Sequence, residues 1–168
     1  MIITADKLSF EYAPKSVFSY HALKEVTTAV KAGSFTTILG ATGSGKSTLV
    51  QHFNALITPT GGTLTIDGKV IQANEKVKEL KLLRKKVGLV FQFPEYQLFE
   101  ETILKDVMFG PLNFGVPVAQ AQEIAQASLL RVGLDVSLFD RSPLELSGGQ
   151  KRRVAIAGIL ALTPKILV

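Results

Sequence analysis

The chain has 168 residues, of which 46% are hydrophobic and 20% charged, and its formal net charge is +5 at pH 7. This length and mixture are typical of one globular domain with a buried core rather than of a disordered chain. There is no cysteine, which excludes disulfides, thiolate zinc sites and cysteine nucleophiles. No apolar run approaches the ~18–20 residues that cross a bilayer, and residues 1–10 lack the apolar centre of a signal peptide. We therefore expect a cytoplasmic protein.

Basic side chains crowd into one short stretch of the chain: Lys76, Lys78, Lys81, Arg84, Lys85 and Lys86. Four apolar residues lie among or beside them: Leu80, Leu82, Leu83 and Val87. This mixture is typical of a solvated helix face, so we expect no nucleic-acid binding.

The first half of the chain predicts several strands and one helix. Alternating β-branched and aromatic residues predict strands over 2–12 and 22–30, joined by a loop that begins at Pro14. A short β-rich run at 34–39, bounded by two glycines, predicts a buried strand. A helix is indicated next, by the apolar spacing of Leu49, Val50, Phe53, Leu56 and Ile57. Residues 63–66 predict a strand that ends in the Asp67–Gly68 turn.

The second half of the chain predicts mainly helices. Residues 75–85 have helical composition, 87–91 predict a buried strand, and 92–100 form a loop that contains Pro94 and three aromatic residues. Two helical patterns follow, the second over Ala121, Ile124, Ala125, Ser128, Leu129 and Val132. A further helix runs from Ser147 through Leu162 and is apolar nearly all round after Val154, which indicates burial. Residues 165–168 predict the start of a strand. The alternation predicts an α/β fold with a helical lobe inserted over about 102–146.

A phosphate-binding loop occupies residues 40–48, which match the pattern G-x-x-x-x-G-K-[ST] between a predicted strand and a predicted helix. Its glycines permit backbone angles that turn consecutive N–H groups toward phosphate oxygens, and the helix start adds its positive dipole end. Lys46 supplies a cation for the β- and γ-phosphates, and the Ser47 hydroxyl can ligate Mg²⁺. A Gly-rich turn that merely precedes a helix would not require the Lys-Ser-Thr run. The predicted nucleotide ligands here are Gly40, Ala41, Thr42, Gly43, Ser44, Gly45, Lys46, Ser47 and Thr48.

A second helix start of the same kind follows at Leu146–Gln150. Ser147 is a good N-cap residue, and Gly148 and Gly149 would let a phosphate approach the backbone N–H groups. A simple capped helix explains the pentapeptide alone equally well. The phosphate loop roughly a hundred residues upstream favours the phosphate interpretation.

With these two motifs in this order and spacing, the chain resembles ATP-binding-cassette ATPases over essentially its whole length. Within it, Val87–Val107 is similar to the energy-coupling factor transporters, which take up vitamins and transition-metal ions. The similarity is closest to the second of their two ATPase subunits. The resemblance implies an ABC-type ATPase that binds ATP and Mg²⁺: a P-loop NTPase core with an N-terminal antiparallel β subdomain and an inserted helical subdomain that carries the signature.

The resemblance also implies roles for single residues. Gln92 would be the catalytic glutamine that reaches Mg²⁺ or the attacking water, and Tyr12 would stack on adenine. From the residues alone, Gln92 fits better as an ordinary loop glutamine, and Tyr12 fits almost as well as a core tyrosine, with Phe10 and Phe18 as rivals for the adenine. Four residues would contact the ATP held by a second ATPase subunit in a head-to-tail dimer, implied to be a heterodimer: Ser147, Gly148, Gly149 and Gln150.

A membrane partner is implied by the aromatic residues of the 92–100 loop. Phe93, Tyr96 and Phe99 would form part of the docking surface for a helix of an integral membrane coupling subunit. Ordinary core packing is the alternative. The resemblance further implies a membrane component that selects the substrate, and a peripheral location at the cytoplasmic face of the cell membrane.

The family's pattern places two acidic residues after the strand that follows the signature helix: an Asp that holds the Mg²⁺ shell and a Glu that polarises water. This sequence stops at Ile166–Val168, before them, so we expect a C-terminally truncated cassette that is inactive alone. We expect an ATP-binding core with the antiparallel sheet over about 1–100, a helical subdomain over 101–150 and a return to the core over 151–168. Two other functions stay open: a soluble cassette ATPase of DNA repair or translation, and a nucleotide-binding fragment without turnover.

Overall fold

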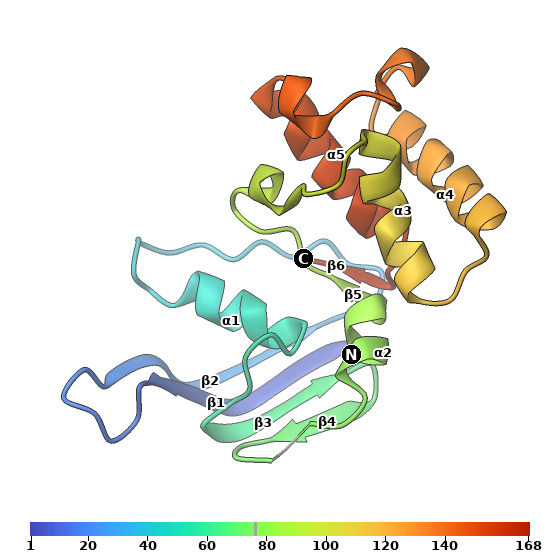
Figure 1. Ribbon diagram of the computed structural model, residues 1–168. Coiled ribbons are helices and arrows are strands. Elements are labelled where there is room, and N and C mark those ends of the chain that lie inside the picture. The colour runs from blue at the N-terminus through green and yellow to red at the C-terminus, as the bar shows by residue number, and fades with distance from the viewer. Residues whose placement is uncertain (76) are drawn as a thin grey trace. The chain divides into compact units, whose positions relative to one another are not determined.

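The computed structural model describes residues 1–75 and 77–168, so Lys76 of the basic stretch lies outside the described residues. The chain divides into two compact units, residues 1–84 and 85–168 (Figure 1). Neither unit contains, in its described part, a helix long and apolar enough to cross a membrane.

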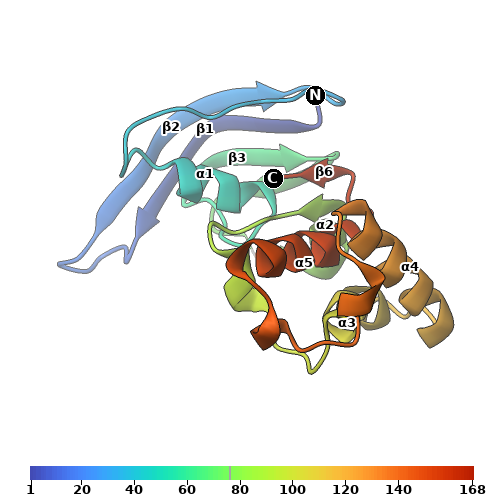
Figure 2. The same cartoon turned by 90° about the horizontal axis from the view of Figure 1, so that it is seen from above.

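Unit 1 is a four-stranded antiparallel sheet with one helix on one face. The strand order is β2 (Tyr20–Val30), β1 (Ile3–Tyr12), β3 (Gly61–Ile66) and β4 (Lys69–Gln72). Helix α1 (Lys46–Phe53) lies over the sheet (Figures 1 and 2). The strands predicted at 2–12, 22–30 and 63–66 are thereby confirmed, whereas β4 had no separate prediction.

Two tight backbone features set the register of the sheet. Lys7 adopts φ 47° at a shift between β1 and its neighbours, opposite Gly62 with φ 75°. A Cβ on Gly62 would lie 2.2 Å from the Lys7 carbonyl oxygen, so only glycine allows the two strands to approach at this bulge. At the other end, Asp67 and Gly68 have φ 45° and 82° and join β3 to β4 as a two-residue hairpin, as predicted.

The core of unit 1 lies between the sheet and α1. Its buried hydrophobic residues come from the strands, from α1 and the residue Ala55 that follows it, and from helix α2 (Leu80–Lys86): Ile3, Ala5, Leu8, Leu23, Phe53, Ala55, Leu64, Ile66, Ile71 and Leu83. Fully burying a side chain of Leu or Ile size contributes about 1.5–3 kcal/mol. The alternation of buried and exposed residues along β1 and β3 therefore fixes which face of the sheet α1 covers.

A histidine is buried within this core. His52 is fully buried, its ring meets Phe10 edge-on at 5.0 Å between centroids, and its Nδ1 lies 2.7 Å from the carbonyl oxygen of Thr48. A carbonyl only accepts, so Nδ1 carries the proton, and Nε2, which has no hydrogen-bond partner among the described residues, is the bare nitrogen. Burial lowers the pKa of His52 below its ordinary value near 6.5, and the hydrogen bond to Thr48 opposes this only in part.

The buried histidine makes stability depend on pH. Because the folded state disfavours the protonated ring, the unfolded chain binds more protons below about pH 6.5, and stability should fall as the pH drops through that value. In full-length protein, thermal unfolding at pH 7.5 and 5.5 should show a drop in Tm that is smaller for His52→Leu. Substitution of the exposed His21 by Gln is the control and should leave the drop as it is in the unsubstituted protein. An equal drop in His52→Leu would contradict this account.

The strand predicted at 34–39 is absent. The described residues of unit 1 place no strand beside this segment, and Phe35 and Leu39 are 97% and 86% exposed. Further along the chain, Gly45 lies against Ala22 of β2. A central parallel strand forms only when neighbouring strands accept its backbone hydrogen bonds. Composition predicted the apolar run correctly but could not supply those neighbours.

The helices predicted around residues 49–57 and over 75–85 are shorter than expected. Helix α1 ends at Phe53 because the chain closes a Schellman turn: Leu56 N donates to Gln51 O, Ala55 N donates to His52 O, and Ala55 has φ 51°. Leu56, expected on the apolar face, is consequently 42% exposed. Helix α2 (Leu80–Lys86) begins five residues after the predicted start at Glu75.

Unit 2 combines a two-stranded parallel ladder with a helical core. Strands β5 (Val87–Gly88) and β6 (Ile166–Leu167) pair in parallel, and Val90 N donates to Val168 O at 2.8 Å. The predicted strand 87–91 is therefore only partly formed, and Phe91 is 42% exposed. A Cβ on Gly88 would lie 2.6 Å from Ile159, so helix α5 (Gly148–Leu160) packs directly on β5.

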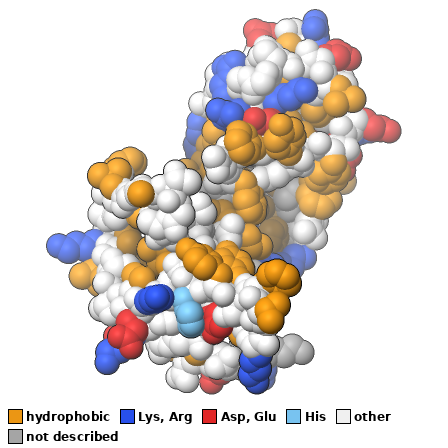
Figure 3. Space-filling model, turned by 90° about the vertical axis from the view of Figure 1, so that its left-hand side faces the viewer, with side chains coloured by type: hydrophobic (Ala, Val, Ile, Leu, Met, Phe, Trp, Pro, Cys, Tyr) orange, Lys and Arg blue, Asp and Glu red, His pale blue; other side chains and the backbone are white. Residues whose placement is uncertain are grey.

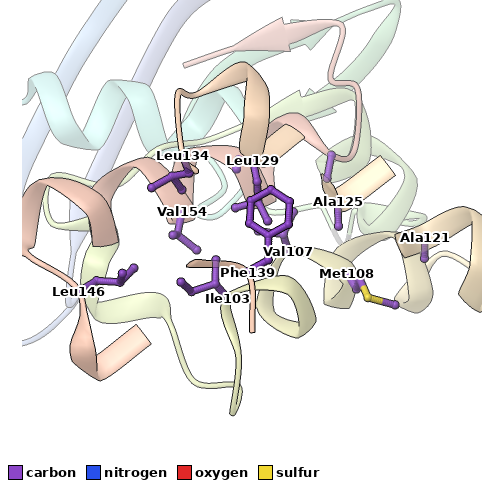
Figure 4. Packing of buried hydrophobic residues seen from close by; sticks show 12 residues of the cluster. Ile103, Val107, Met108, Ala121, Ala125, Leu129, Leu134, Phe139, Leu146 and Val154 are labelled. Atoms are coloured by element: carbon purple, nitrogen blue, oxygen red, sulfur yellow. The ribbon is translucent and has the colours of Figure 1, made fainter. Parts of the chain in front are cut away.

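The helical core of unit 2 comprises α3 (Ile103–Asn113), α4 (Val118–Arg131) and α5 (Gly148–Leu160) (Figures 2 and 4). Short 3₁₀ turns lie at η1 (Pro94–Gln97), η2 (Val136–Leu138) and η3 (Pro143–Glu145). The two predicted helices between 102 and 146 are confirmed, and α5 ends two residues before the predicted Leu162. The buried side chains of the cluster are Ile103, Val107, Met108, Ala121, Ala125, Leu129, Leu134, Phe139, Leu146, Val154, Ala157 and Ala161.

Candidate functional site

The phosphate loop of unit 1 leads into a helix whose start has no side-chain cap. Gly45 is the N-cap residue of α1, with φ 86°, and no side chain in the described part of the chain caps the first turn. Gly43 is also left-handed, with φ 82°. The backbone N–H groups of a first helical turn need partners from outside the helix. The loop therefore presents donors and the positive end of the helix dipole together.

Lys46 folds back over this loop. Its Nζ donates to the carbonyl oxygens of Gly40 at 2.9 Å and Ala41 at 2.7 Å. The ammonium thus lies at the mouth of the loop, next to the backbone that the motif assigns to phosphate. The Ser47 side chain, one residue further on, is exposed.

The loop is held against β2 by two contacts. A Cβ on Gly45 would lie 2.5 Å from the carbonyl oxygen of Ala22 and 3.0 Å from a methyl carbon of Leu23, so no other residue fits there. The Tyr20 hydroxyl donates to the Gly43 carbonyl oxygen at 3.4 Å. The start of β2 thus fixes the position of the loop.

Tyr12 lies beside the first turn of α1. It ends β1, is 41% exposed, and its hydroxyl is 3.3 Å from the hydroxyl of Thr48. Phe10 meets the rings of both Tyr12 and His52 edge-on, which makes it part of the packing behind the loop. Phe18, the other rival for the adenine, is 82% exposed in the loop between β1 and β2.

The signature segment Ser147–Gln150 forms the start of α5 in unit 2. Ser147 and Gln150 make a reciprocal capping box: Gln150 N donates to Ser147 Oγ at 3.3 Å, and Ser147 N donates to Gln150 Oε1 at 2.9 Å. Gly148 and Gly149 are exposed, and a Cβ on either would meet no atom within 4 Å. The predicted N-cap role of Ser147 is confirmed, and the open space around the glycines is compatible with a ligand.

Gln92 and the predicted docking aromatics lie together in unit 2, directly after the parallel ladder. Gln92 is exposed, as are Phe93 at 53%, Tyr96 at 85% and Phe99 at 64%. Phe99 packs edge-on against Phe109 of α3 at 4.9 Å. In unit 2, Figure 3 shows hydrophobic side chains in orange at the surface, bordered by Lys and Arg in blue. The core-packing alternative for these three aromatics is therefore wrong.

Two arginines that follow the signature make contacts for which the sequence carries no local signal. Arg152 pairs with Glu95 of η1 at 3.2 Å, across 57 positions. Arg153 donates to the carbonyl oxygen of Gly133 at 2.8 Å, where α4 ends in a Schellman turn. The basic run after the signature was visible in the sequence, but partners so distant were not.

The geometry described so far agrees with comparisons to known proteins. The ABC transporter family profile matches residues 23–168, which is most of the chain. The chain belongs to the ABC transporter family. It is 54% identical over 167 residues to the energy-coupling factor transporter ATP-binding protein EcfA2 of Lactococcus lactis subsp. cremoris, covering 99% of this chain and 58% of that protein. Identity to EcfA2 of Bacillus subtilis is 57% over 154 residues, covering 92% of this chain and 56% of that protein. The chain thus spans somewhat more than half the length of these relatives.

Solved structures of other ABC proteins have the same fold. CbiO1 of Clostridium perfringens, part of the ABC transporter complex CbiONQ, superposes with a TM-score of 0.81 at 36% identity, covering 99% of this chain and 63% of that one. The ATP-binding cassette MJ0796, in a dimeric post-hydrolysis state bound to ADP and Pi, gives a TM-score of 0.86 at 30% identity, covering 98% of this chain and 72% of that one. The predicted α/β fold of an ABC ATPase is confirmed.

The two left-handed loop glycines should differ in their tolerance of a side chain. Gly45→Ala puts a methyl group 2.5 Å from Ala22 O, whereas Gly43→Ala meets no atom within 4 Å. Both variants should lose the roughly 1–2 kcal/mol that a left-handed backbone costs a non-glycine residue, and Gly45→Ala should lose clearly more. Urea unfolding of full-length protein without nucleotide measures the difference. Equal losses would show that the loop does not pack on β2 as described.

Proposed function

We propose that this chain is the nucleotide-binding portion of an ATPase subunit that couples ATP binding and hydrolysis to import of a vitamin or metal ion by an energy-coupling factor transporter. The observation that carries the proposal is the uncapped start of α1, with left-handed Gly43 and Gly45 and the Lys46 ammonium at the loop mouth. The similarity to EcfA2 proteins supports the transport class.

The residues of unit 1 fit the phosphates of ATP. The backbone N–H groups of 40–48 would surround the phosphate oxygens, and Lys46 would exchange its two carbonyl partners for the β- and γ-phosphates. The exchange is reasonable because charge-assisted bonds to phosphate are stronger than bonds to neutral carbonyls. Tyr12 offers its half-exposed ring to the adenine while its hydroxyl stays beside Thr48.

Mg²⁺ would enter together with the nucleotide. The described residues contain no group of three or more His, Asp or Glu side chains that could hold a metal by themselves. Ser47, whose hydroxyl is exposed, would complete a coordination shell built mainly of phosphate oxygens and water. When bound, the ion would neutralise charge on the transferred phosphoryl group.

The signature would act on the nucleotide of a second ATPase subunit. The cap uses the side chains of Ser147 and Gln150 on each other's backbone, so the backbone N–H groups of Gly148 and Gly149 are the donors that point out of the helix start. Their open surroundings allow a phosphate to approach. We propose a head-to-tail dimer, as a heterodimer with a second ABC ATPase subunit. The dimeric state of MJ0796 supports this assembly.

The exposed aromatics of 92–100 would receive a helix of an integral membrane coupling subunit, while another membrane component binds the substrate. CbiO1, as part of a transporter complex, supports this arrangement. The subunit would then work as a peripheral protein at the cytoplasmic face of the membrane. In this proposal residues 1–100 hold the nucleotide-binding core, 101–150 the signature-bearing helices, and 151–168 the return to the core.

Replacement of Lys46 tests the phosphate site. Lys46→Ala removes charge-assisted contacts worth roughly 1.5–3 kcal/mol, which is a ten- to hundred-fold loss in ATP affinity. Titration calorimetry on full-length protein with Mg·ATP measures it. Lys24→Ala, at an exposed lysine of β2, is the control for loss of one positive charge and should bind normally. Unchanged affinity in Lys46→Ala would refute the site.

Replacement of Gly148 separates a signature from a plain helix start. In full-length protein assembled with its partner subunits, Gly148→Asp would place a carboxylate where the partner's γ-phosphate is proposed to lie. Like charges at about 4 Å cost on the order of 4 kcal/mol at a surface-like dielectric, so ATPase activity of the complex should fall at least a hundred-fold. ATP affinity of the isolated subunit should stay normal.

The matched control for that charge is Gly148→Asn, which has nearly the same size. It should keep much more activity than Gly148→Asp. If the isolated Gly148→Asp subunit loses ATP affinity, Gly148 belongs to its own site or its fold. If the complex keeps full activity, the segment is only a capped helix.

A further inference from the structure

An ion pair inside unit 2 joins the loop of residues 92–100, called the aromatic loop below, to α5, the helix that begins with the signature. Both carboxylate oxygens of Glu95 accept hydrogen bonds from Arg152, from Nη2 at 3.2 Å and from Nε at 3.4 Å. The Glu95 side chain is 17% exposed and that of Arg152 is 54% exposed. The bond to Arg152 lowers the pKa of Glu95, which keeps the carboxylate charged.

Glu95 lies at the centre of a loop that is fixed at both ends. At the near end, Val90 N donates to Val168 O in the parallel ladder. At the far end, the backbone N–H groups of Phe99 and Glu100 both donate to one oxygen of Asp106, at 2.8 and 2.9 Å. Between these anchors Glu95 reaches α5, and its neighbours Phe93 and Tyr96 point their exposed rings outward.

Arg152 is placed to move the signature. It lies two residues after Gln150, which closes the capping box at the start of the same helix. Its neighbour Arg153 fixes α5 to the end of α4 through the carbonyl oxygen of Gly133. Arg153 thus links α5 to the helical core, whereas Arg152 links α5 to the aromatic loop.

Arg152 bonds to Glu95 through two nitrogens, which restricts the orientation of the two side chains. An Arg fork that meets both oxygens of one carboxylate restricts the angle as well as the distance between two elements. A shift of η1 must then either break the pair or be followed by the first turns of α5. Exposed ion pairs contribute little to stability, so the value of this one lies in positioning rather than in folding.

We propose that the Glu95–Arg152 pair is a positioning device that carries displacement of the aromatic loop, when a partner docks on it, to the signature at the start of α5. The proposal rests on the proposed function, and it adds two residues that set how well the signature is aligned for the partner subunit's nucleotide. Neither residue would contact the nucleotide itself.

A double-mutant cycle in the assembled full-length complex tests the pair. Glu95→Gln and Arg152→Gln should each lower kcat of ATP hydrolysis about five- to tenfold with KM for ATP unchanged, and the double variant should be no worse than the worse single one. ATP affinity of the isolated full-length subunits should not change, because neither Glu95 nor Arg152 belongs to the proposed nucleotide site. Glu101→Gln is the matched control: it breaks the Glu101–Lys105 pair at the start of α3, which joins no two elements in this way, and should leave kcat unchanged.

The outcomes are distinguishable. The positioning role would be overturned if kcat were unchanged in the variants, if the losses in kcat of the two single variants added up in the double variant, or if Glu101→Gln lost as much. ATP hydrolysis by the unsubstituted complex would still support the proposed function in each of these cases. An unsubstituted complex that hydrolyses no ATP would overturn the proposed function and this inference with it.

Discussion

The missing side-chain cap of α1 is the constraint on which the candidate site depends. A helix start without a cap leaves backbone donors that something else must satisfy, and Gly45 cannot supply an oxygen. It must be glycine because its backbone is left-handed and because Ala22 O leaves no room for a Cβ. Gly45 therefore has two effects: it lets the loop pack on β2, and it leaves the backbone N–H groups of the helix start exposed. Lys46 occupies the loop carbonyls but leaves these donors available to an anion.

The start of α5 also leaves backbone N–H groups without helical partners, but here side chains satisfy part of them. Its Ser147–Gln150 box satisfies two donors within the helix, so α5 is stable without a ligand. Gly148 and Gly149 add no side chains that would shield the remaining N–H groups. A helix that is already capped suits a role in which contact with a phosphate is made and broken as subunits meet. An uncapped one suits a site that holds the phosphate throughout.

Local signals predicted the parts of the fold that local geometry determines. The Asp67–Gly68 hairpin and the period of α4 are each encoded within a few residues, and each has the predicted form. The failures have distant or unusual causes. The run at 34–39 needs strand neighbours that no local pattern supplies, and α1 ends at a left-handed Ala55 where a sequence signal would be glycine. Side-chain partners such as Glu95 and Arg152, far apart in sequence, leave no pattern at all.

The aromatic loop is unusual because its exposure is enforced. Phe93, Tyr96 and Phe99 would gain free energy by burial, yet buried Pro94 and the Glu95–Arg152 pair hold the loop with these rings outward. Such exposed clusters mark interaction sites, and a loop fixed at both ends loses little further entropy when a partner docks. The same rigidity means that a docked partner cannot be accommodated by bending the loop alone. Displacement must pass to whatever the loop is bonded to, and Glu95 bonds it to the helix that begins with the signature.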